Sequence, residues 1–249
     1  MSAFRAVVLD FDGLILETEG AAWVSWRELF QAHGSDYTLE DFQQGIGSAR
    51  TAHALFEERC GRPEDWSVLD LRRREVEARL HAGLAVQPGI ESLLVQSRAL
   101  GLGIAVASSS SHAWVDRLLY VHGLLDRFDA VVCREDAALA KPAPDLYREA
   151  LRRLGAEQSE AVAFEDSLNG VLAAHAAGIR CVAVPTPMTA TQDFSRADLV
   201  VGTLADLDLR ALLARLATGS SRGPGRSPPS DAMSNLGLLG RPRGNPRRT

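Results

Sequence analysis

The chain has 249 residues, 46% of them hydrophobic, and a formal net charge of −5. This length can bury a large core in one domain or in two smaller ones, and the negative charge argues against nucleic acid as a partner of the globular part. The chain shows neither a signal peptide nor an apolar run of membrane-spanning length, so we expect a cytoplasmic protein with no membrane partner. Cys60, Cys133 and Cys181 are far apart and lack metal-ligand spacing, which predicts reduced thiols.

Residues 6–9, Ala-Val-Val-Leu, form an apolar run of strand length that leads directly into Asp10-Phe11-Asp12-Gly13. Two carboxylates at the end of a buried strand cost desolvation energy unless a cation or hydrogen-bond donors receive them. Because ligands bind at the carboxyl ends of strands in a doubly wound sheet, Asp10 and Asp12 are candidate catalytic residues. Alternatively, the two residues only shape the turn before Gly13, although a turn needs one Asp rather than two.

The pattern changes after this first motif. Residues 18–33, 39–60 and 65–82 carry apolar positions at three- and four-residue spacing, which predicts helices, and no convincing strand lies among them. Strand-like and helical segments alternate again after Pro88, up to a last helix near residues 207–216. We therefore expect an α/β core at residues 1–16 and 87–217, built on a doubly wound, Rossmann-like parallel sheet, with an all-helical insertion at residues 17–86.

A second strand-like run, residues 103–107, opens into four consecutive serines and a helix at about residues 112–121. Hydroxyls and free N–H groups at the start of a helix suit an anionic ligand, which makes Ser108 and Ser109 candidate binding residues. The serines could equally be ordinary helix N-caps, and this is the interpretation we favour for Ser110 and Ser111.

Only one of the 27 Lys and Arg residues is a lysine, Lys141, which stands in Ala-Lys-Pro-Ala-Pro-Asp. An ammonium group is a compact charge that fits against one phosphoryl oxygen or a pair of carboxylates, where a planar guanidinium is too bulky. The alternative is that a single surface lysine survived drift.

A third strand-like run, residues 161–164, ends in Glu165-Asp166, a second acidic pair at a strand end. This pair could also simply complement the dipole of the helix that follows it.

Residues 218–249 form a Gly-, Pro-, Ser- and Arg-rich tail with six arginines and one aspartate. The tail lacks apolar periodicity, so we expect it to be disordered. Its arginines could contact nucleic acid or an acidic surface, but a solvated tail without such a role is the simpler interpretation.

Together these residues resemble the motifs of the haloacid dehalogenase-like superfamily of phosphatases and phosphomutases, in the family's order and over roughly residues 4–216. Each match alone is weak, whereas four in order are specific; they are Asp10-x-Asp12-Gly13, Ser108, Lys141 in Lys-Pro-x-Pro-Asp, and Glu165-Asp166. Residues 12–19 look most like the branch of β-phosphoglucomutase and small sugar-phosphate phosphatases, except that Glu17 stands where the branch usually has Asp.

The resemblance implies a phosphatase mechanism. Asp10 would attack phosphorus and form an aspartyl-phosphate, and Asp12 would protonate the leaving alcohol and later activate water. Mg²⁺ would lie between Asp10, the backbone carbonyl of Asp12 and Asp166, with Glu165 beside the ion or on one of its waters. Ser108 and the N–H group of Ser109 would hold phosphoryl oxygens, while Lys141 would neutralise charge on the phosphoryl group and on Asp10.

The resemblance also makes the helical insertion a mobile cap, with hinges near Leu16-Glu17 and Val86-Gln87, that sets substrate choice. Arg50, in a loop similar to the branch's specificity loop, could grip a second phosphate or a carboxylate. We expect Trp23 and Trp26 to be core residues of this insertion rather than a sugar platform. The six histidines lack metal-ligand spacing and are expected to be surface or helix residues; they are His33, His53, His81, His112, His122 and His175.

The expected enzyme is a phosphatase of a small phosphorylated metabolite, a sugar or polyol phosphate or phosphoglycolate, acting as a monomer or weak dimer. β-Phosphoglucomutase-like activity remains an alternative, but Ala22 and Ser48 align with the cap histidine and arginine that such mutases use. A phosphonoacetaldehyde hydrolase would need a second lysine, and Asp12 argues against a metal-free dehalogenase. Two remote alternatives belong to other classes. The helical insertion and the Asp-x-Asp spacing argue against a receiver-like signalling module, and the filled catalytic positions argue against a non-catalytic binding protein.

Overall fold

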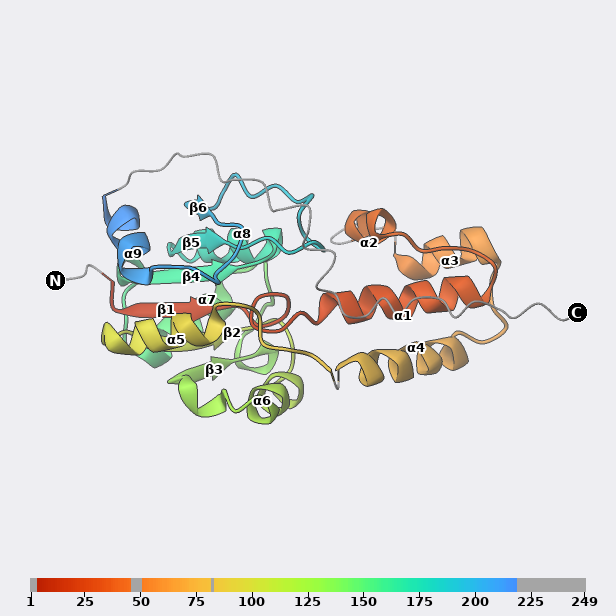
Figure 1. Cartoon of the computed structure of the whole chain (residues 1–249), viewed down its shortest axis with the longest axis horizontal. Helices are drawn as coiled ribbons and strands as arrows, with labels where there is room; N and C mark the ends of the chain where they lie inside the picture. Colours follow the sequence, from red (N-terminus) through yellow and green to blue (C-terminus); the bar gives the residue numbers. More distant parts are fainter. Residues whose placement is uncertain (1–3, 46–50, 82, 219–249) are drawn as a thin grey trace, which may run out of the picture.

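The protein is described by a computed structural model of residues 4–45, 51–81 and 83–218. In this part of the chain, six parallel strands form one sheet in the order β3-β2-β1-β4-β5-β6 (Figure 1). The strands are β1 (Ala6–Leu9), β2 (Gly103–Ala107), β3 (Ala130–Val132), β4 (Ala161–Glu165), β5 (Arg180–Ala183) and β6 (Leu199–Val200). This order is that of a doubly wound Rossmann-like sheet, so the predicted fold class is confirmed.

Helices cover both faces of the sheet, which explains why its central strands are apolar throughout rather than alternating. Side chains of a strand point to opposite faces in turn. Val7 and Leu9 therefore pack into one cluster with α5 (Ile90–Ala99), α6 (His112–Val121) and α9 (Leu209–Ala217). Ala6 and Val8 pack into a second cluster with α7 (Asp145–Leu154) and α8 (Leu168–Ala176). Burial on both faces is typical of parallel strands and holds their ends in fixed positions.

The segment between β1 and α5 contains, in its described residues, the helices α1 (Glu19–Ala32), α2 (Leu39–Gly45), α3 (Ala52–Cys60) and α4 (Trp66–His81). They lie together beyond the carboxyl end of β1 (Figure 1). Their shared core is aromatic, and Trp23 and Trp26 belong to it with 7% and 8% of their surface exposed, so their expected role as core residues is confirmed. Trp23 Nε1 also donates a hydrogen bond to the Tyr37 carbonyl at 3.2 Å.

The prediction of one helix over residues 39–60 is wrong. Thr51 has an extended backbone, with φ −74° and ψ 158°, and its hydroxyl accepts a hydrogen bond from the Ala54 N–H at 3.2 Å. A threonine in this conformation caps a new helix, so α3 begins at Ala52 and is separate from α2. The periodicity of apolar residues continues across this break because both helices pack on α1 or on each other.

The two chain segments that connect the helical insertion to the core run side by side. Leu16 pairs with Asp12 in parallel fashion and with Val86 in antiparallel fashion. The Gln87 N–H donates to the Ile15 carbonyl at 2.9 Å, and the Gln87 side chain donates to the Gly13 carbonyl at 3.1 Å. These contacts lie where the sequence places the two hinges; the boundaries at residues 16–17 and 86–87 stay predictions.

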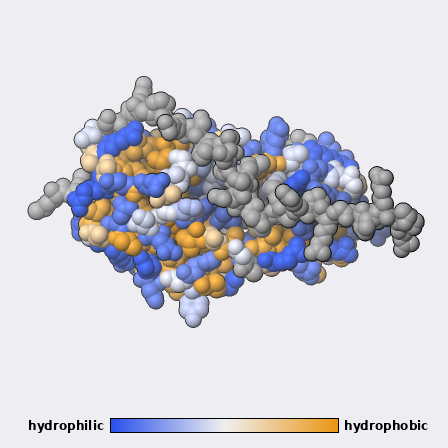
Figure 2. Space-filling view, viewed as in Figure 1, coloured by the Kyte–Doolittle hydropathy of each residue, from blue (hydrophilic) through white to orange (hydrophobic). Residues whose placement is uncertain are grey.

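The insertion also touches the core through the loop after β5. Met188 is 1% exposed and packs in the aromatic cluster of the insertion, and Gln43 Nε2 donates to the Pro187 carbonyl at 2.6 Å. On the visible face, hydrophilic residues dominate the outer end of the insertion (Figure 2). None of the described helices combines the length and apolar character that crossing a membrane requires. Except for Thr218, the predicted tail lies outside the described residues.

Candidate active site

The sheet places two acidic strand ends next to each other. β1 and β4 are hydrogen-bonded neighbours, and the strand order reverses direction between them. Asp10 follows β1, and Glu165 and Asp166 stand at the end of β4. The crevice at such a switch point is where open α/β sheets bind ligands. The candidate site predicted from Asp10, Glu165 and Asp166 is therefore assembled by the topology of the sheet.

Lys141 is buried at this crevice, with 6% of its side chain exposed, so it is not a leftover surface lysine. Its Nζ donates hydrogen bonds to Asp10 Oδ1 and to Glu165 Oε1, the latter at 2.6 Å. Burial alone would lower the pKa of Lys141, but the charges of Asp10 and Glu165 outweigh it, and the net shift of this pKa is upward. Lys141 is therefore a permanently charged ammonium between two carboxyl groups.

Glu165 is fully buried, and its carboxylate accepts a hydrogen bond that holds Lys141 in place. Its Oε1 accepts hydrogen bonds from Lys141 and, at 2.5 Å, from the Tyr147 hydroxyl. A Cβ atom on Gly170 would lie 1.9 Å from Glu165 Oε2, so the glycine leaves the space that this carboxylate occupies. The sequence analysis did not single out Tyr147, which lies in α7. A role of Glu165 at a metal ion stays a prediction.

Three carboxyl groups lie together at this ammonium, and Lys141 donates hydrogen bonds to two of them, Asp10 and Glu165. Oxygen atoms of Asp10, Glu165 and Asp166 lie within 4.8 Å of one another, and all three residues are buried. Burial, followed by the charge of Glu165, raises the pKa of Asp10 to about 8, and burial also raises the pKa of Asp166. Asp166 Oδ2 is buried and has no hydrogen-bond partner among the described residues.

These carboxyl groups fit a hard divalent cation. With all three ionised, the group carries a net charge of −2 after Lys141 is counted, which a divalent cation would neutralise. An all-oxygen donor set with an unpaired buried oxygen suits Mg²⁺. Gly13, with φ 84°, leaves this oxygen open, because a Cβ atom there would lie 2.2 Å from Asp166 Oδ2.

The Asp12 side chain is held by three donors. Thr18 Oγ1 and Trp114 Nε1 donate to Asp12 Oδ1 at 2.8 and 2.9 Å, and Ser110 Oγ donates to Asp12 Oδ2 at 2.6 Å. Ser110 is therefore not a helix cap as predicted. Ser111 precedes α6 as expected, but its side chain makes no capping bond within the described residues. Ser110, just before α6, and Trp114, in its first turn, are 98 and 102 residues from Asp12, so sequence spacing does not identify them as its partners.

Ser108 and Ser109 lie beside this group. Ser108 is 1% exposed, and its hydroxyl accepts a hydrogen bond from the Ser110 N–H at 3.0 Å. Ser109 Oγ accepts a hydrogen bond from the Lys141 N–H at 3.3 Å, which ties the second and third motifs together. The predicted binding residue Arg50 lies outside the described residues.

Glu19 is a further acidic group at the site that the sequence analysis did not single out. It is the first residue of α1, and its Oε2 is buried without a hydrogen-bond partner among the described residues. Burial, and then the charges of Glu17 and Asp12, raise its pKa to about 7. The helical insertion thus contributes a carboxyl group of its own to the crevice.

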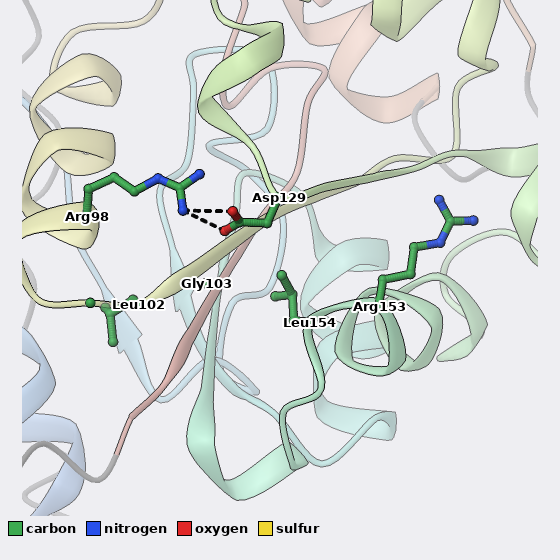
Figure 3. A pocket seen from close by; sticks show the side chains of 7 residues that line it. Arg98, Leu102, Gly103, Asp129, Arg153 and Leu154 are labelled. Atoms are coloured by element: carbon green, nitrogen blue, oxygen red, sulfur yellow. Dashed lines mark hydrogen bonds and ion pairs between the residues drawn. The ribbon is translucent and has the colours of Figure 1, made fainter.

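A separate groove of about 440 Å³ lies at the amino end of β2, opposite the carboxyl-end crevice (Figure 3). Arg98 points at Asp129 there and donates to both of its carboxylate oxygens at 2.7 and 2.8 Å. Arg153, which also lines the groove, pairs with Asp136 and Glu149. Among the described residues, the groove therefore offers no unpaired arginine for a phosphoryl ligand, and the candidate active site remains the crevice around Asp10.

Comparison with known proteins agrees with this geometry. The family model of haloacid dehalogenase-like hydrolases matches residues 7–184. YhcW of Bacillus subtilis (strain 168) is 37% identical over 214 residues, covering 85% of this chain and 97% of YhcW. The crystal structure of CbbY from Rhodobacter sphaeroides in complex with phosphate superposes with a TM-score of 0.67 at 31% identity, covering 84% of this chain and 99% of CbbY.

The relatives also include an enzyme named for phosphate ester hydrolysis. Validoxylamine A 7'-phosphate phosphatase of Streptomyces hygroscopicus subsp. limoneus is 27% identical over 210 residues, covering 82% of this chain and 96% of that protein. The match to the family model spans both acidic strand ends, Ser108 and Lys141. The chain therefore belongs to the haloacid dehalogenase-like hydrolases, and it is a phosphoric monoester hydrolase.

Proposed function

We propose that this chain is a Mg²⁺-dependent phosphatase that hydrolyses a small phosphorylated metabolite through an aspartyl-phosphate on Asp10. The observation that supports this most directly is the buried ammonium of Lys141, hydrogen-bonded to Asp10 at the switch point of the sheet, with the unpaired Oδ2 of Asp166 beside it. Two carboxyl groups and one lysine in this arrangement form a receptor for a phosphoryl group and its counter-ion.

Asp10 is the nucleophile in this proposal. Its carboxylate attacks phosphorus, the bond to the substrate alcohol breaks, and the phosphoryl group is held on Asp10. Lys141 lowers the repulsion between the two anions, since its Nζ already contacts Asp10. Tyr147 and Glu165 position Lys141, because Glu165 accepts hydrogen bonds from both of them.

Asp12 carries the proton. It gives a proton to the leaving alcohol and then takes one from the water that releases phosphate from Asp10, which returns both residues to their starting states. Thr18, Trp114 and Ser110 orient its carboxyl group. Ser108 and the N–H group of Ser109, at the end of β2, would bind phosphoryl oxygens.

Asp10, Asp166 and the backbone carbonyl of Asp12 would hold the Mg²⁺ ion, with Glu165 beside it or on one of its waters. When bound, the ion neutralises charge on the phosphoryl group and on the carboxylates. The fit rests on the oxygen donor set and its net charge of −2 with Lys141 included.

The helical insertion is proposed to act as the cap that excludes water and selects the substrate. CbbY from Rhodobacter sphaeroides has also been solved with xylulose-(1,5)bisphosphate, which supports sugar phosphates and bisphosphates as the first class to test. Phosphoglycolate belongs on the same panel. Three expectations stay predictions. Arg50 would bind a second anionic group of the substrate, the protein would be cytoplasmic, and it would act as a monomer or weak dimer.

The test measures inorganic phosphate release from sugar, polyol, glycolate and nucleotide monophosphates and from sugar bisphosphates. Reactions contain Mg²⁺ or EDTA, and Asp10→Asn is compared with Ser111→Ala, whose hydroxyl makes no capping bond within the described residues. We expect metal-dependent release that Asp10→Asn abolishes and Ser111→Ala preserves. Release that persists in Asp10→Asn would overturn the aspartyl-phosphate. Conversion of β-glucose 1-phosphate to glucose 6-phosphate without phosphate release would replace the hydrolase by a mutase.

A further inference from the structure

A second cluster of metal-binding side chains lies outside the active site. His112 is the first residue of α6, Asp116 follows it by four residues on the same helix face, and Cys133 comes directly after β3. Each residue offers one potential ligand atom, and these three atoms lie within 4.8 Å of one another. They are an imidazole nitrogen, a carboxylate oxygen and the thiol sulfur. Cys133 is fully buried, whereas the side chains of His112 and Asp116 are 34% and 44% exposed, so the cluster opens to solvent on one side.

The Asp136 carboxylate orients the imidazole of His112 through the ring nitrogen Nε2. His112 Nε2 lies 2.6 Å from Asp136 Oδ2, and the same oxygen accepts a hydrogen bond from the Cys133 N–H at 2.8 Å. Asp136 Oδ1 accepts one from Arg153 at 2.5 Å. When Nε2 donates to Asp136, the lone pair of Nδ1 faces Asp116 and Cys133. Histidine ligands of metal ions are commonly fixed in this way by a carboxylate on the other ring nitrogen.

The contact on the other side of the ring requires a positive charge. His112 Nδ1 lies 3.1 Å from Asp116 Oδ2, a separation at which a lone pair and a carboxylate repel unless a proton or a metal ion lies between them. A proton would account for this pair alone. It would leave the second oxygen, Asp116 Oδ1, buried without a hydrogen-bond partner among the described residues. The Cys133 thiol lies beside this carboxylate, and its sulfur accepts a hydrogen bond from the Asp136 backbone N–H.

The surrounding charge favours a dication. Asp116, Asp136 and Glu135 face His112, and Glu135 Oε2 accepts a hydrogen bond from the His112 N–H at 3.2 Å. Arg153 is the cation that reaches this group among the described ion pairs, and it also pairs with Glu149 at 2.7 Å.

We propose that His112, Asp116 and Cys133 form a binding site for a divalent transition-metal ion of the Zn²⁺ class, with water as the fourth ligand. Nitrogen, sulfur and one carboxylate oxygen are the donors of tetrahedral zinc sites, whereas Mg²⁺ prefers oxygen alone. Tetrahedral ligands at zinc distances stand about 3.3 to 3.8 Å apart, so small side-chain shifts bring these three atoms to the ion.

The site joins two segments that carry the active-site loops. The Arg134 N–H, one residue after Cys133, donates to the Ser110 carbonyl at 3.0 Å, and His112 begins the helix that follows Ser108–Ser111. A bound ion would therefore link the segment after β2 to the segment after β3 and stabilise the folded protein by mass action. Ligand chemistry and position separate this site from the oxygen-only group at Asp10.

The experiment titrates the full chain with Cd²⁺ and with Co²⁺ and records the near-ultraviolet thiolate-to-metal charge-transfer band. The active-site group contains no sulfur, so the band reports a cysteine ligand rather than metal bound at the acidic group. We expect a band that saturates at one equivalent, disappears in Cys133→Ser, and persists in Cys60→Ser, the matched thiol control. It also persists in Asp166→Asn, which separates this result from the fate of the phosphatase proposal. A wild-type protein without the band, or a band that survives Cys133→Ser, would overturn the site.

Cys133→Ser could fail to fold because Cys133 is buried, so a second variant, Asp116→Asn, changes a ligand that is partly exposed. Zn²⁺ affinity is measured by competition with a chromophoric chelator. Asp116→Asn should weaken Zn²⁺ binding at least tenfold, and Asp136→Asn should weaken it about 10- to 100-fold through the histidine. The exposed Asp126→Asn serves as the control and should bind as the wild type does. Wild-type affinity in Asp116→Asn would contradict the proposed ligand set.

Discussion

The ammonium of Lys141 and the carboxylate of Glu165 are joined by a 2.6 Å hydrogen bond at the centre of the active site. Glu165 is fully buried and Lys141 nearly so, and a buried carboxylate is tolerated only when it is paired. Asp10 shares the same ammonium. One lysine therefore satisfies a structural carboxylate and the proposed nucleophile together, which explains why this position differs from the other basic positions of the chain.

Replacing this lysine by arginine should inactivate the enzyme although the charge is kept. A planar guanidinium is too large for the space between Asp10 and Glu165, and it cannot donate to both oxygens in the same way. We expect Lys141→Arg to lower kcat by about 100- to 1000-fold. The reverse exchange on the surface, Arg152→Lys, is the control, since Arg152 is 71% exposed. A kcat within threefold of wild type in Lys141→Arg would show that the compact ammonium is dispensable.

Replacing Ser110 by alanine should lower kcat, whereas replacing the adjacent Ser111 should not. Ser110 Oγ donates to Asp12 Oδ2 at 2.6 Å, whereas the Ser111 side chain makes no capping bond within the described residues. Hydrogen bonds to charged groups contribute about 1.5 to 3 kcal/mol, so a misplaced Asp12 should lower kcat about tenfold or more in Ser110→Ala. Steady-state kinetics with a common substrate would compare the two alanine variants. Equal effects would argue that the run acts only as a helix start.

Gly13→Ala should impair metal-dependent activity. Gly13 has φ 84°, and a Cβ atom there would fall 2.2 Å from Asp166 Oδ2. Gly34 has a similar φ of 76° but no described atom within 4 Å of an added Cβ, so Gly34→Ala isolates the backbone strain of about 1 to 2 kcal/mol. Urea unfolding would measure this strain in both variants. Only Gly13→Ala should also raise the Mg²⁺ concentration for half-maximal activity, and an unchanged Mg²⁺ dependence would contradict a role of Asp166 at the ion.

The helical insertion should lose stability in acid through Asp41. Arg59 donates hydrogen bonds of 2.8 and 2.7 Å to the two Asp41 oxygens and, as the largest cause, lowers the pKa of Asp41 from 3.8 to about 2. A folded-state pKa below the unfolded value stabilises the fold above about pH 4 and ceases to do so as the pH falls toward 2. Since Arg59 is 33% exposed, solvent screening reduces the effect to on the order of 1 kcal/mol.

Urea unfolding of Asp41→Asn and of the exposed control Asp126→Asn would test this between pH 7 and pH 3. Asp41→Asn should be less stable than wild type at pH 7, and the difference should narrow as the pH falls below 4. A difference that stays constant over this range would mean that the ion pair does not set the pKa of Asp41.

Local patterns in the sequence predicted the elements that carry the site. The apolar run at residues 6–9 with Asp10 and Asp12 behind it, the solitary Lys141, and the acidic pair at the end of the run at residues 161–164 each mark a strand end or a special charge within a few residues. Burial and periodicity are short-range properties, so a single segment suffices to predict them. The alternation of strand-like and helical segments predicted the fold class, whereas the enzyme class came from the resemblance of the ordered motifs to a known family.

Only the tertiary structure decided which side chains meet. Ser110 donates a hydrogen bond to Asp12, which lies 98 residues away in the sequence. Tyr147 in α7 donates to Glu165 at the end of β4. His112, after β2, lies close to Cys133, after β3. The sequence alone predicted Ser110 as a helix cap and one helix where Thr51 starts a second, and both predictions are wrong. It predicted His112 correctly as a surface or helix residue but did not predict which side chains it meets. Such contacts depend on which strands become neighbours and in what register, and that outcome is set by the packing of the whole sheet rather than by any single segment.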